Sequence, residues 1–152
     1  MKNYKFCAFT GHREISEDFD EELLDRVVTD LIKCGTEVFY TGMAMGFDLI
    51  AAECVLRLKK KFKKLKLVAC IPYKGQAVGY TSSEKVRYQR ILDCCDESIC
   101  LSEEYHDGCF FERNRYMVDS CDVVIAYLRK KRGGTYYTVN YADATNKKVI
   151  KL

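Results

Sequence analysis

The chain has 152 residues, of which 48% are hydrophobic and 31% charged, and its formal net charge is +3. This length is enough for one domain with a sizeable core but not for two. The small net charge does not indicate a nucleic-acid binder, and no apolar run approaches the roughly 20 residues of a membrane span. We therefore expect a single domain over residues 1–152, located in the cytoplasm, with no membrane contact and with nucleic acid disfavoured but not excluded as a partner.

The nine cysteines and two histidines show no metal-binding spacing. There is no Cys-x-x-Cys pair, and His12 and His106 are far apart, so no metal site is expected. The odd number of cysteines argues against a disulfide scaffold. The adjacent Cys94 and Cys95 are either a redox-active pair or, as preferred here, a pair of which one cysteine faces the core. Four cysteines in or beside apolar runs are expected to be small buried hydrophobes: Cys7, Cys70, Cys100 and Cys121.

The first two strand–helix units follow from the apolar pattern. Residues 4–10 are almost continuously apolar, as a central parallel strand requires. A helix is expected to begin near Asp18, with Glu21 as its capping-box partner. Residues 37–41 form a second strand, which leads through a turn with two glycines into a helix over 47–60.

A lysine-rich segment, residues 59–66, follows this helix. It is either a contact for a phosphate backbone or a solvated helix end, where lysines favour the negative end of the helix dipole. The second interpretation is preferred, because the segment lies at the far end of its helix from the glycine turn. The later strands are expected at 65–71, 97–101, 123–127 and 148–152, and the later helices at 83–95, 109–120 and 136–145.

The alternation of strands and helices predicts an α/β fold. It favours a three-layer α/β/α sandwich with a mostly parallel sheet of about six strands. Ligands of such sheets bind beyond the carboxyl ends of the strands, where the winding direction reverses. The segments expected at that edge are rich in Gly, Arg, Thr, Tyr and Gln: 10–13, 41–48, 72–76, 102–105 and 129–135.

The turn Thr41-Gly42-Met43-Ala44-Met45-Gly46-Phe47-Asp48 joins a short strand to a helix. Free backbone N–H groups and the positive end of the helix dipole meet there, which favours an anion and above all a phosphate. The alternative is that the glycines serve only the backbone angles of a tight turn. Two more glycine-bearing turns, after the first and fifth strands, favour the ligand site.

Several motifs occur together along the chain: Phe9-Thr10-Gly11-His12-Arg13, the glycine turn with Ala51-Ala52-Glu53, Pro72 with Gln76, Tyr105, Arg113-Asn114-Arg115-Tyr116-Met117-Val118-Asp119, and Gly133-Gly134-Thr135. In this order and spacing the chain resembles the SLOG superfamily, which contains DprA (Smf) and the LOG phosphoribohydrolases. Within it, the chain is most similar to the YpsA-like group of small stand-alone bacterial proteins. The resemblance implies a Rossmann-like fold that binds nucleotide-derived ligands at the carboxyl edge of the sheet.

The resemblance also implies roles for individual residues. Two segments would form phosphate loops: Gly42, Met43, Ala44 and Gly46, and then Gly133, Gly134 and Thr135. Two arginines, Arg13 and Arg113, would contact phosphate, although Arg13 could instead pair with Glu14 or Glu17. The remaining candidates are Thr10, Gly11, His12, Asp48 and Asn114. His12 is either a ligand contact or a satisfied histidine at a strand end, Asp48 contacts a ribose or caps its helix, and Asn114 bonds a sugar or base or caps a turn.

Departures from the family pattern limit the function that can be inferred. LOG enzymes carry Pro-Gly-Gly-x-Gly-Thr-x-x-Glu, whereas this chain lacks the leading proline, the third glycine and the glutamate around Gly133-Gly134-Thr135. The preferred function is therefore binding or sensing of an ADP-ribose-like or dinucleotide-like small molecule, with no certain cofactor. A hydrolase using Asp48, Glu112 or His12, and a DprA-like binder of single-stranded DNA, are the alternatives. The eleven tyrosines leave a homo-oligomer open.

Overall fold

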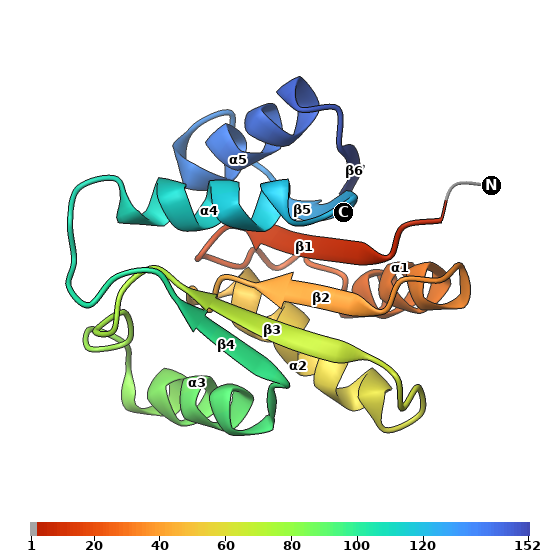
Figure 1. Cartoon of the computed structure of the whole chain (residues 1–152), viewed down its shortest axis with the longest axis horizontal. Helices are drawn as coiled ribbons and strands as arrows, with labels where there is room; N and C mark the ends of the chain where they lie inside the picture. The colour runs from red at the N-terminus through yellow and green to blue at the C-terminus, as the bar shows by residue number, and fades with distance from the viewer. Residues whose placement is uncertain (1–2) are drawn as a thin grey trace.

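The computed structural model describes residues 3–152, which form one sheet with helices on both faces (Figure 1). The six strands run parallel in the order β4-β3-β2-β1-β5-β6. They are β1 (Phe6–Gly11), β2 (Val38–Thr41), β3 (Lys66–Ile71), β4 (Glu97–Cys100), β5 (Val123–Tyr127) and β6 (Lys148–Lys151). The helices are α1 (Glu21–Lys33), α2 (Phe47–Lys59), α3 (Ser82–Cys94), α4 (Cys109–Asp119) and α5 (Gly133–Ala144).

The direction of winding reverses beside β1. The chain builds outward from β1 to β4 and then returns to place β5 on the other side of β1. Helix α2 contacts both α1 and α3 on one face, whereas α4 and α5 pack together on the other (Figure 1). The predicted three-layer α/β sandwich with a parallel six-stranded sheet is therefore confirmed, and its switch point lies between β1 and β5.

Successive residues of β1 supply the cores of the two faces, because side chains alternate along a strand. Phe9 belongs to the larger cluster, where its ring stacks on Phe39 with centroids 5.7 Å apart and meets Phe47 of α2 edge-on at 6.1 Å. Ala8 belongs to the smaller cluster beneath α4, together with Met117. The fully buried Phe47 therefore fixes the start of α2 against β1.

Two helix starts differ from the sequence-based expectation. Helix α1 begins at Glu21 and not near Asp18, because Asp20 is its N-cap and accepts a hydrogen bond from the Leu23 N–H at 3.0 Å. Asp18 instead bonds the Ser16 hydroxyl. Helix α5 begins at Gly133 and not near residue 136, so the two glycines are part of its first turn.

The cysteines largely follow their expected burial. Cys7, Cys70 and Cys121 are buried, and Cys95 packs against the larger core while Cys94 is exposed. The expectation for Cys100 was wrong. It ends the edge strand β4, where its thiol lies in solvent and donates to the Ser102 carbonyl at 3.2 Å.

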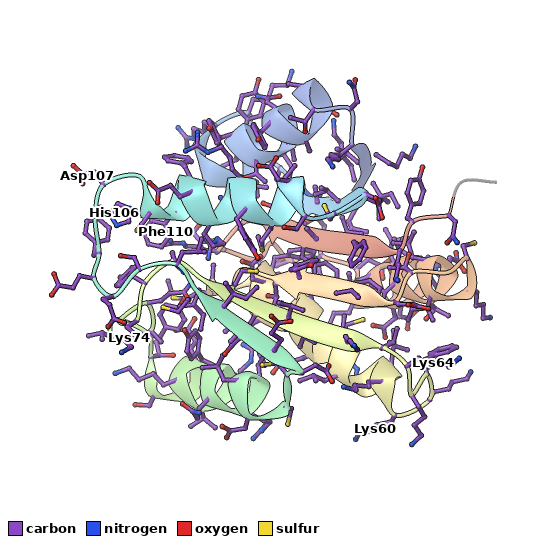
Figure 2. The ribbon with its side chains drawn as sticks, viewed as in Figure 1. Lys60, Lys64, Lys74, His106, Asp107 and Phe110 are labelled. Carbon is purple, nitrogen blue, oxygen red and sulfur yellow. The ribbon has the colours of Figure 1, made fainter. Side chains whose placement is uncertain are left out.

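The lysine-rich segment lies far from the carboxyl edge of the sheet. Figure 2 shows Lys60 and Lys64 near the end of α2, at the opposite end of the molecule from Phe110. Lys60, Lys61, Lys63, Lys64 and Lys66 are exposed, and Lys59 forms an ion pair with Asp96. This placement agrees with a solvated helix end. Among residues 3–152, no helix combines the length and apolar character that crossing a bilayer requires.

Candidate functional site

A cavity of about 350 Å³ opens at the carboxyl edge of the sheet, beside the switch point. The end of β1, the turn before α2, the first turns of α4 and the start of α5 surround it. Ten of the predicted site residues line it, together with two phenylalanines: Thr10, Gly11, His12, Arg13, Ala44, Asp48, Phe110, Phe111, Arg113, Asn114, Gly134 and Thr135.

The start of α5 presents free backbone donors to this cavity. Its N-cap residue, Arg132, is extended, and no side chain of the described residues caps the helix there. Gly133 has φ +89°, and a Cβ added at Gly134 would meet open space. The first N–H groups of a helix lack internal partners and carry the positive end of its dipole. Because Gly134 and Thr135 line the cavity, this end of α5 is suited to an anionic group.

The turn after β2 acts mainly as a scaffold. Gly46 has φ +75°, and a Cβ there would collide with the Arg13 carbonyl oxygen. Met43 also has a positive φ, 61°, and its side chain is fully buried in the core. Of the four residues expected in the first phosphate loop, Ala44 alone lines the cavity. Gly46 therefore serves the backbone angles of the turn. Of the second expected phosphate loop, Gly133 does not line the cavity either.

Arg113 is buried beside this turn, with 4% of its surface exposed. Its Nη1 donates to the carbonyl oxygen of Gly42, and its Nε donates to Asn114 Oδ1 at 2.7 Å. Burial lowers the pKa of the guanidinium group, and the charge of Asp48 opposes that shift. Gln76 reinforces the same carbonyl, since its Nε2 donates to Gly42 at 2.9 Å.

Asp48, in the first turn of α2, is the buried carboxylate of the site. It is 5% exposed, and its Oδ2 accepts a hydrogen bond from the Ala44 N–H at 3.3 Å. Burial raises the pKa of this carboxyl to about 6, and the charge of Arg113, the Ala44 hydrogen bond and the charge of Arg13 oppose the shift. The side chain thus closes the turn before its own helix and also borders the cavity.

Arg13 and Arg113 both lie close to the ring of Phe110. The Cζ atom of Arg13 is 5.3 Å from the ring centroid and that of Arg113 is 5.9 Å from it, within cation–π range. Within residues 3–152, Arg13 forms no ion pair with Glu14 or Glu17. An exposed guanidinium group is therefore held at the mouth of the cavity.

Sequence reasoning missed Phe110 and Phe111. They lie in the first turn of α4, just before Arg113, and Phe111 packs on Tyr137 of α5 with centroids 4.6 Å apart. The signal was present, because an aromatic pair at the start of a helix after β4 lies at the carboxyl edge of the sheet.

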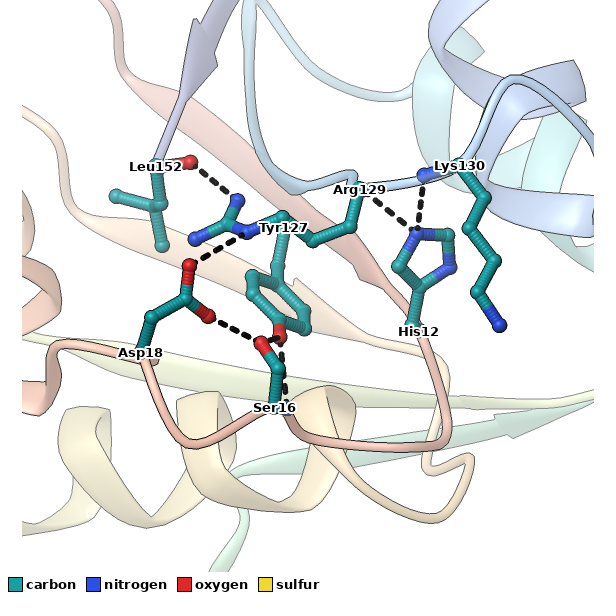
Figure 3. A network of polar contacts seen from close by, with 7 residues as sticks. All are labelled: His12, Ser16, Asp18, Tyr127, Arg129, Lys130 and Leu152. Atoms are coloured by element: carbon teal, nitrogen blue, oxygen red, sulfur yellow. Dashed lines mark hydrogen bonds and ion pairs between the residues drawn. The ribbon is translucent and has the colours of Figure 1, made fainter.

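His12 holds the loop that leads into α5 (Figure 3). Its Nε2 accepts hydrogen bonds from the backbone N–H groups of Arg129 at 2.7 Å and Lys130 at 3.3 Å. Burial and the charges of Lys130 and Arg129 lower the pKa of the ring. The Arg129 side chain donates to the Leu152 carbonyl at 2.8 Å and pairs with Asp18 at 3.6 Å. His12 is thus a satisfied histidine that also borders the cavity.

Two other candidates lie outside the cavity. Glu112 is exposed on α4 and pairs with His106, with 3.0 Å between the carboxylate and Nε2. Arg115 is exposed on the same helix. Among residues 3–152, no group of three or more His, Cys, Asp or Glu side chains is arranged to hold a metal ion.

Comparison with known proteins identifies the family. The chain is 32% identical over 119 residues to YoqJ, an uncharacterised SPβ prophage-derived protein of Bacillus subtilis, covering 70% of both chains. Its fold is similar to DNA processing protein A (DprA) of Streptococcus pneumoniae (TM-score 0.69, 24% identity, 97% of this chain and 53% of that one). It is also similar to DprA of Helicobacter pylori (TM-score 0.70, 21% identity, 96% of this chain and 64% of that one), whose structure concerns single-stranded DNA binding.

The chain thus spans between half and two thirds of these DprA chains, and the similarity shows a shared fold alone. The model of the YspA SLOG family matches residues 1–151, almost the full length of the sequence. The resemblance inferred from the glycine turn, the Arg-Asn-Arg segment and Gly133-Gly134-Thr135 is confirmed. The chain belongs to the YpsA family of SLOG proteins, described as the YspA SLOG family.

Proposed function

We propose that this protein binds a nucleotide-derived small molecule, of the ADP-ribose or dinucleotide type, in the cavity beside the β1–β5 switch point. One observation carries the proposal: the uncapped start of α5 and the buried Arg113 border the same 350 Å³ cavity. A buried arginine and a free helix N-terminus together favour a phosphate.

The other walls suit the remainder of a nucleotide. Phe110 and Phe111 add aromatic faces to the cavity, against which a base can stack, and Thr10 and Thr135 add hydroxyl groups. A volume of about 350 Å³ is within the range of small-molecule sites. Aromatic side chains together with a small number of polar and charged groups are the usual composition of such a site.

A thermal-shift screen tests the proposal. The purified protein is heated with nucleoside mono- and diphosphates, NAD, ADP-ribose, cyclic dinucleotides and short single-stranded oligomers. A ligand at 100 times its dissociation constant stabilises the native state by about 2.7 kcal/mol, which gives a clear rise in melting temperature. A small-molecule hit recovered unchanged after incubation supports binding or sensing. No shift with any nucleotide derivative overturns the proposal.

Asp48 favours a hydrolase as the second candidate. A cavity carboxyl whose pKa is raised to about 6 is suited to proton transfer near neutral pH. Glu112 is a weaker candidate because it lies outside the cavity and pairs with His106. Consumption of the hit during incubation, followed by chromatography, would identify this activity, and an Asp48→Asn variant should then bind without turnover.

A single-stranded DNA binder is the third candidate, favoured by the fold shared with DprA. A second hollow of about 420 Å³ shares His12 and Arg13 with the cavity and adds Arg129 and Lys130, which gives a strand a basic path. Salt separates this candidate from the first, because a backbone binder loses affinity steeply between low and moderate ionic strength. If only the oligomers raise the melting temperature, and if this effect weakens as salt is added, DNA binding would replace the small-molecule proposal.

A further inference from the structure

Aromatic side chains form two groups beside the cavity, and each group contributes one ring to its lining. The outer aromatic cluster is Tyr73, Tyr105 and Phe110, whose ring centroids lie 5.6–6.2 Å apart. The inner aromatic pair is Phe111 and Tyr137, with centroids 4.6 Å apart. Tyr105 is 58% exposed, Phe111 41% and Tyr137 38%, so both groups present ring surface to a ligand.

The strand order places these two groups on opposite sides of a cationic region. The loops after β3 and β4 carry the two tyrosines of the outer aromatic cluster, on one side of β1, whereas Tyr137 lies on α5, which follows β5 on the other side. Arg13 comes just after β1 and, like Arg113, lies close to the ring of Phe110. Along this edge of the sheet the order of groups is therefore aromatic, cationic, aromatic.

The outer aromatic cluster is held in place by contacts between its two loops. The backbone N–H of Lys74 donates to the Ser102 carbonyl at 3.2 Å, and Lys74 Nζ pairs with Glu103 at 3.0 Å. Figure 2 shows Lys74 at the same end of the molecule as Phe110. Because the loops are joined, the ring of Tyr105 is positioned before a ligand binds, which lowers the entropy cost of binding.

A dinucleotide has the same order of groups, because its phosphates lie between two aromatic bases. A cavity of about 350 Å³ is near the lower end of the range of small-molecule sites, so the second half of such a ligand extends beyond it. The two arginines already lie near Phe110, which leaves Tyr105 as the most exposed ring of the outer aromatic cluster. A ligand with one base uses only one of the two aromatic groups.

We propose that the ligand is a dinucleotide with two bases, one of which stacks on Phe111 in the cavity while the other stacks on Tyr105 outside it. Its phosphates then lie at Arg13, Arg113 and the start of α5. This inference rests on the proposed function and narrows its ligand class. Because every base has a face that can stack on an aromatic ring, affinity depends on the presence of the second base more than on its identity.

The test compares diadenosine diphosphate with ADP-ribose by calorimetry. The two ligands share an adenine, two riboses and two phosphates, and they differ in the second base. Diadenosine diphosphate is expected to bind the wild type about 5- to 150-fold more tightly, the range for stacking of one base. Tyr105→Ala should reduce this ratio to less than about threefold, whereas Tyr105→Phe keeps the ring and should preserve the ratio.

Tyr116→Ala is the matched control, since it removes another exposed tyrosine, on α4 and outside the cavity, and should leave the ratio unchanged. A second measurement uses fluorescence. The chain has no tryptophan, so Tyr105→Trp adds a single indole, whose emission should be quenched by diadenosine diphosphate and much less by ADP-ribose. Melting curves establish that each variant is folded.

Equal affinities of the two ligands for the wild type would show that the two-base inference is wrong, and the proposed function would stand. The same holds if Tyr105→Ala weakens both ligands equally, because Tyr105 would then serve only to hold its loop. A short single-stranded oligomer that binds more tightly than diadenosine diphosphate at moderate salt would overturn the inference in favour of DNA. If no nucleotide derivative binds at all, the proposed function fails as well.

Discussion

Arg113 donates a hydrogen bond from Nη1 to the carbonyl oxygen of Gly42, joining α4 to the turn after β2. The two residues are 71 positions apart in the sequence. The contact requires Gly42 to have no side chain, because a Cβ would lie 2.9 Å from the Arg113 Cζ atom and equally close to Asp48 Oδ2. The glycine therefore brings a buried cation and a buried carboxylate together.

Gly42→Ala should displace the Arg113 guanidinium group and abolish nucleotide binding while the protein still folds. The fold should survive because the colliding atoms are side-chain ends and not backbone. Calorimetry with the nucleotide that gives the largest shift in the screen measures the loss. Gly79→Ala is the control, since a Cβ there meets nothing within 4 Å. Unchanged binding by Gly42→Ala would remove Arg113 from the site.

The sheet and its helices could be predicted from the sequence because the apolar pattern fixes which segments are buried. The start of α1 could not, since Asp18 and Asp20 are both suitable caps and Ser16 determines the outcome by bonding Asp18. The site was predicted in part. The alternation of strands and helices predicts a parallel sheet, in which the carboxyl ends of β1 and β5 lie at the same edge. The segments that follow these two strands could therefore be predicted to lie at the site.

The internal geometry of the site depends on packing that no local pattern encodes. Met43 follows a glycine in a motif typical of a phosphate loop, yet its side chain fills the core. His12 faces the N–H groups of a loop that is more than 110 residues away in the sequence. Phe110 matters because two arginines from different elements lie near its ring. The contacts of His12 with the Arg129 loop and of Arg13 with Phe110 are long-range.

Asp48 should make the protein less stable as the pH rises. Its folded pKa of about 6 exceeds its ordinary value of 3.8, so the native state holds the proton more tightly than the unfolded state. The resulting stabilisation is fully present below pH 3.8 and is lost as the pH rises through 6. The shift corresponds to about 3 kcal/mol, as an order of magnitude.

Asp48→Asn cannot ionise, so its free energy of unfolding relative to wild type should increase between pH 4 and pH 7. Urea titrations at closely spaced pH values measure the difference, in which the contributions of all other acids cancel. A difference that does not vary with pH would mean that the Asp48 carboxyl titrates normally.

His12 should act in the opposite direction. Its folded pKa lies below its ordinary value of 6.5, because burial and the charges of Lys130 and Arg129 disfavour the protonated ring. The neutral ring also accepts the Arg129 and Lys130 N–H groups. The stabilisation is present above pH 6.5 and is lost as the pH falls through the folded pKa. Amide hydrogen exchange at these two residues, corrected for the intrinsic pH dependence, should lose protection below pH 6.5. In His12→Ala, protection should be low at every pH.

Gly134→Val should fill the space in front of the α5 N-terminus and reduce nucleotide binding by at least about 100-fold, equivalent to about 2.7 kcal/mol. A Cβ at Gly134 meets no atom within 4 Å, so the melting temperature should change little. Gly134→Ala adds a single carbon and should have an intermediate effect. Normal binding by the valine variant would show that the α5 start does not contact the ligand.

Arg13→Ala should weaken nucleotide binding by about 1.5–3 kcal/mol, the range for a hydrogen bond to a charged group. Stability should be nearly unaffected, because Arg13 is exposed and its contact with Phe110 is a surface cation–π interaction. Arg13→Lys keeps the charge but loses the planar, bidentate geometry, so it should recover only part of the affinity. Arg90→Ala, which removes an exposed arginine on α3, is the control for net charge. Equal affinities for wild type and Arg13→Ala, measured at low salt where a charged contact is strongest, would place Arg13 outside the site.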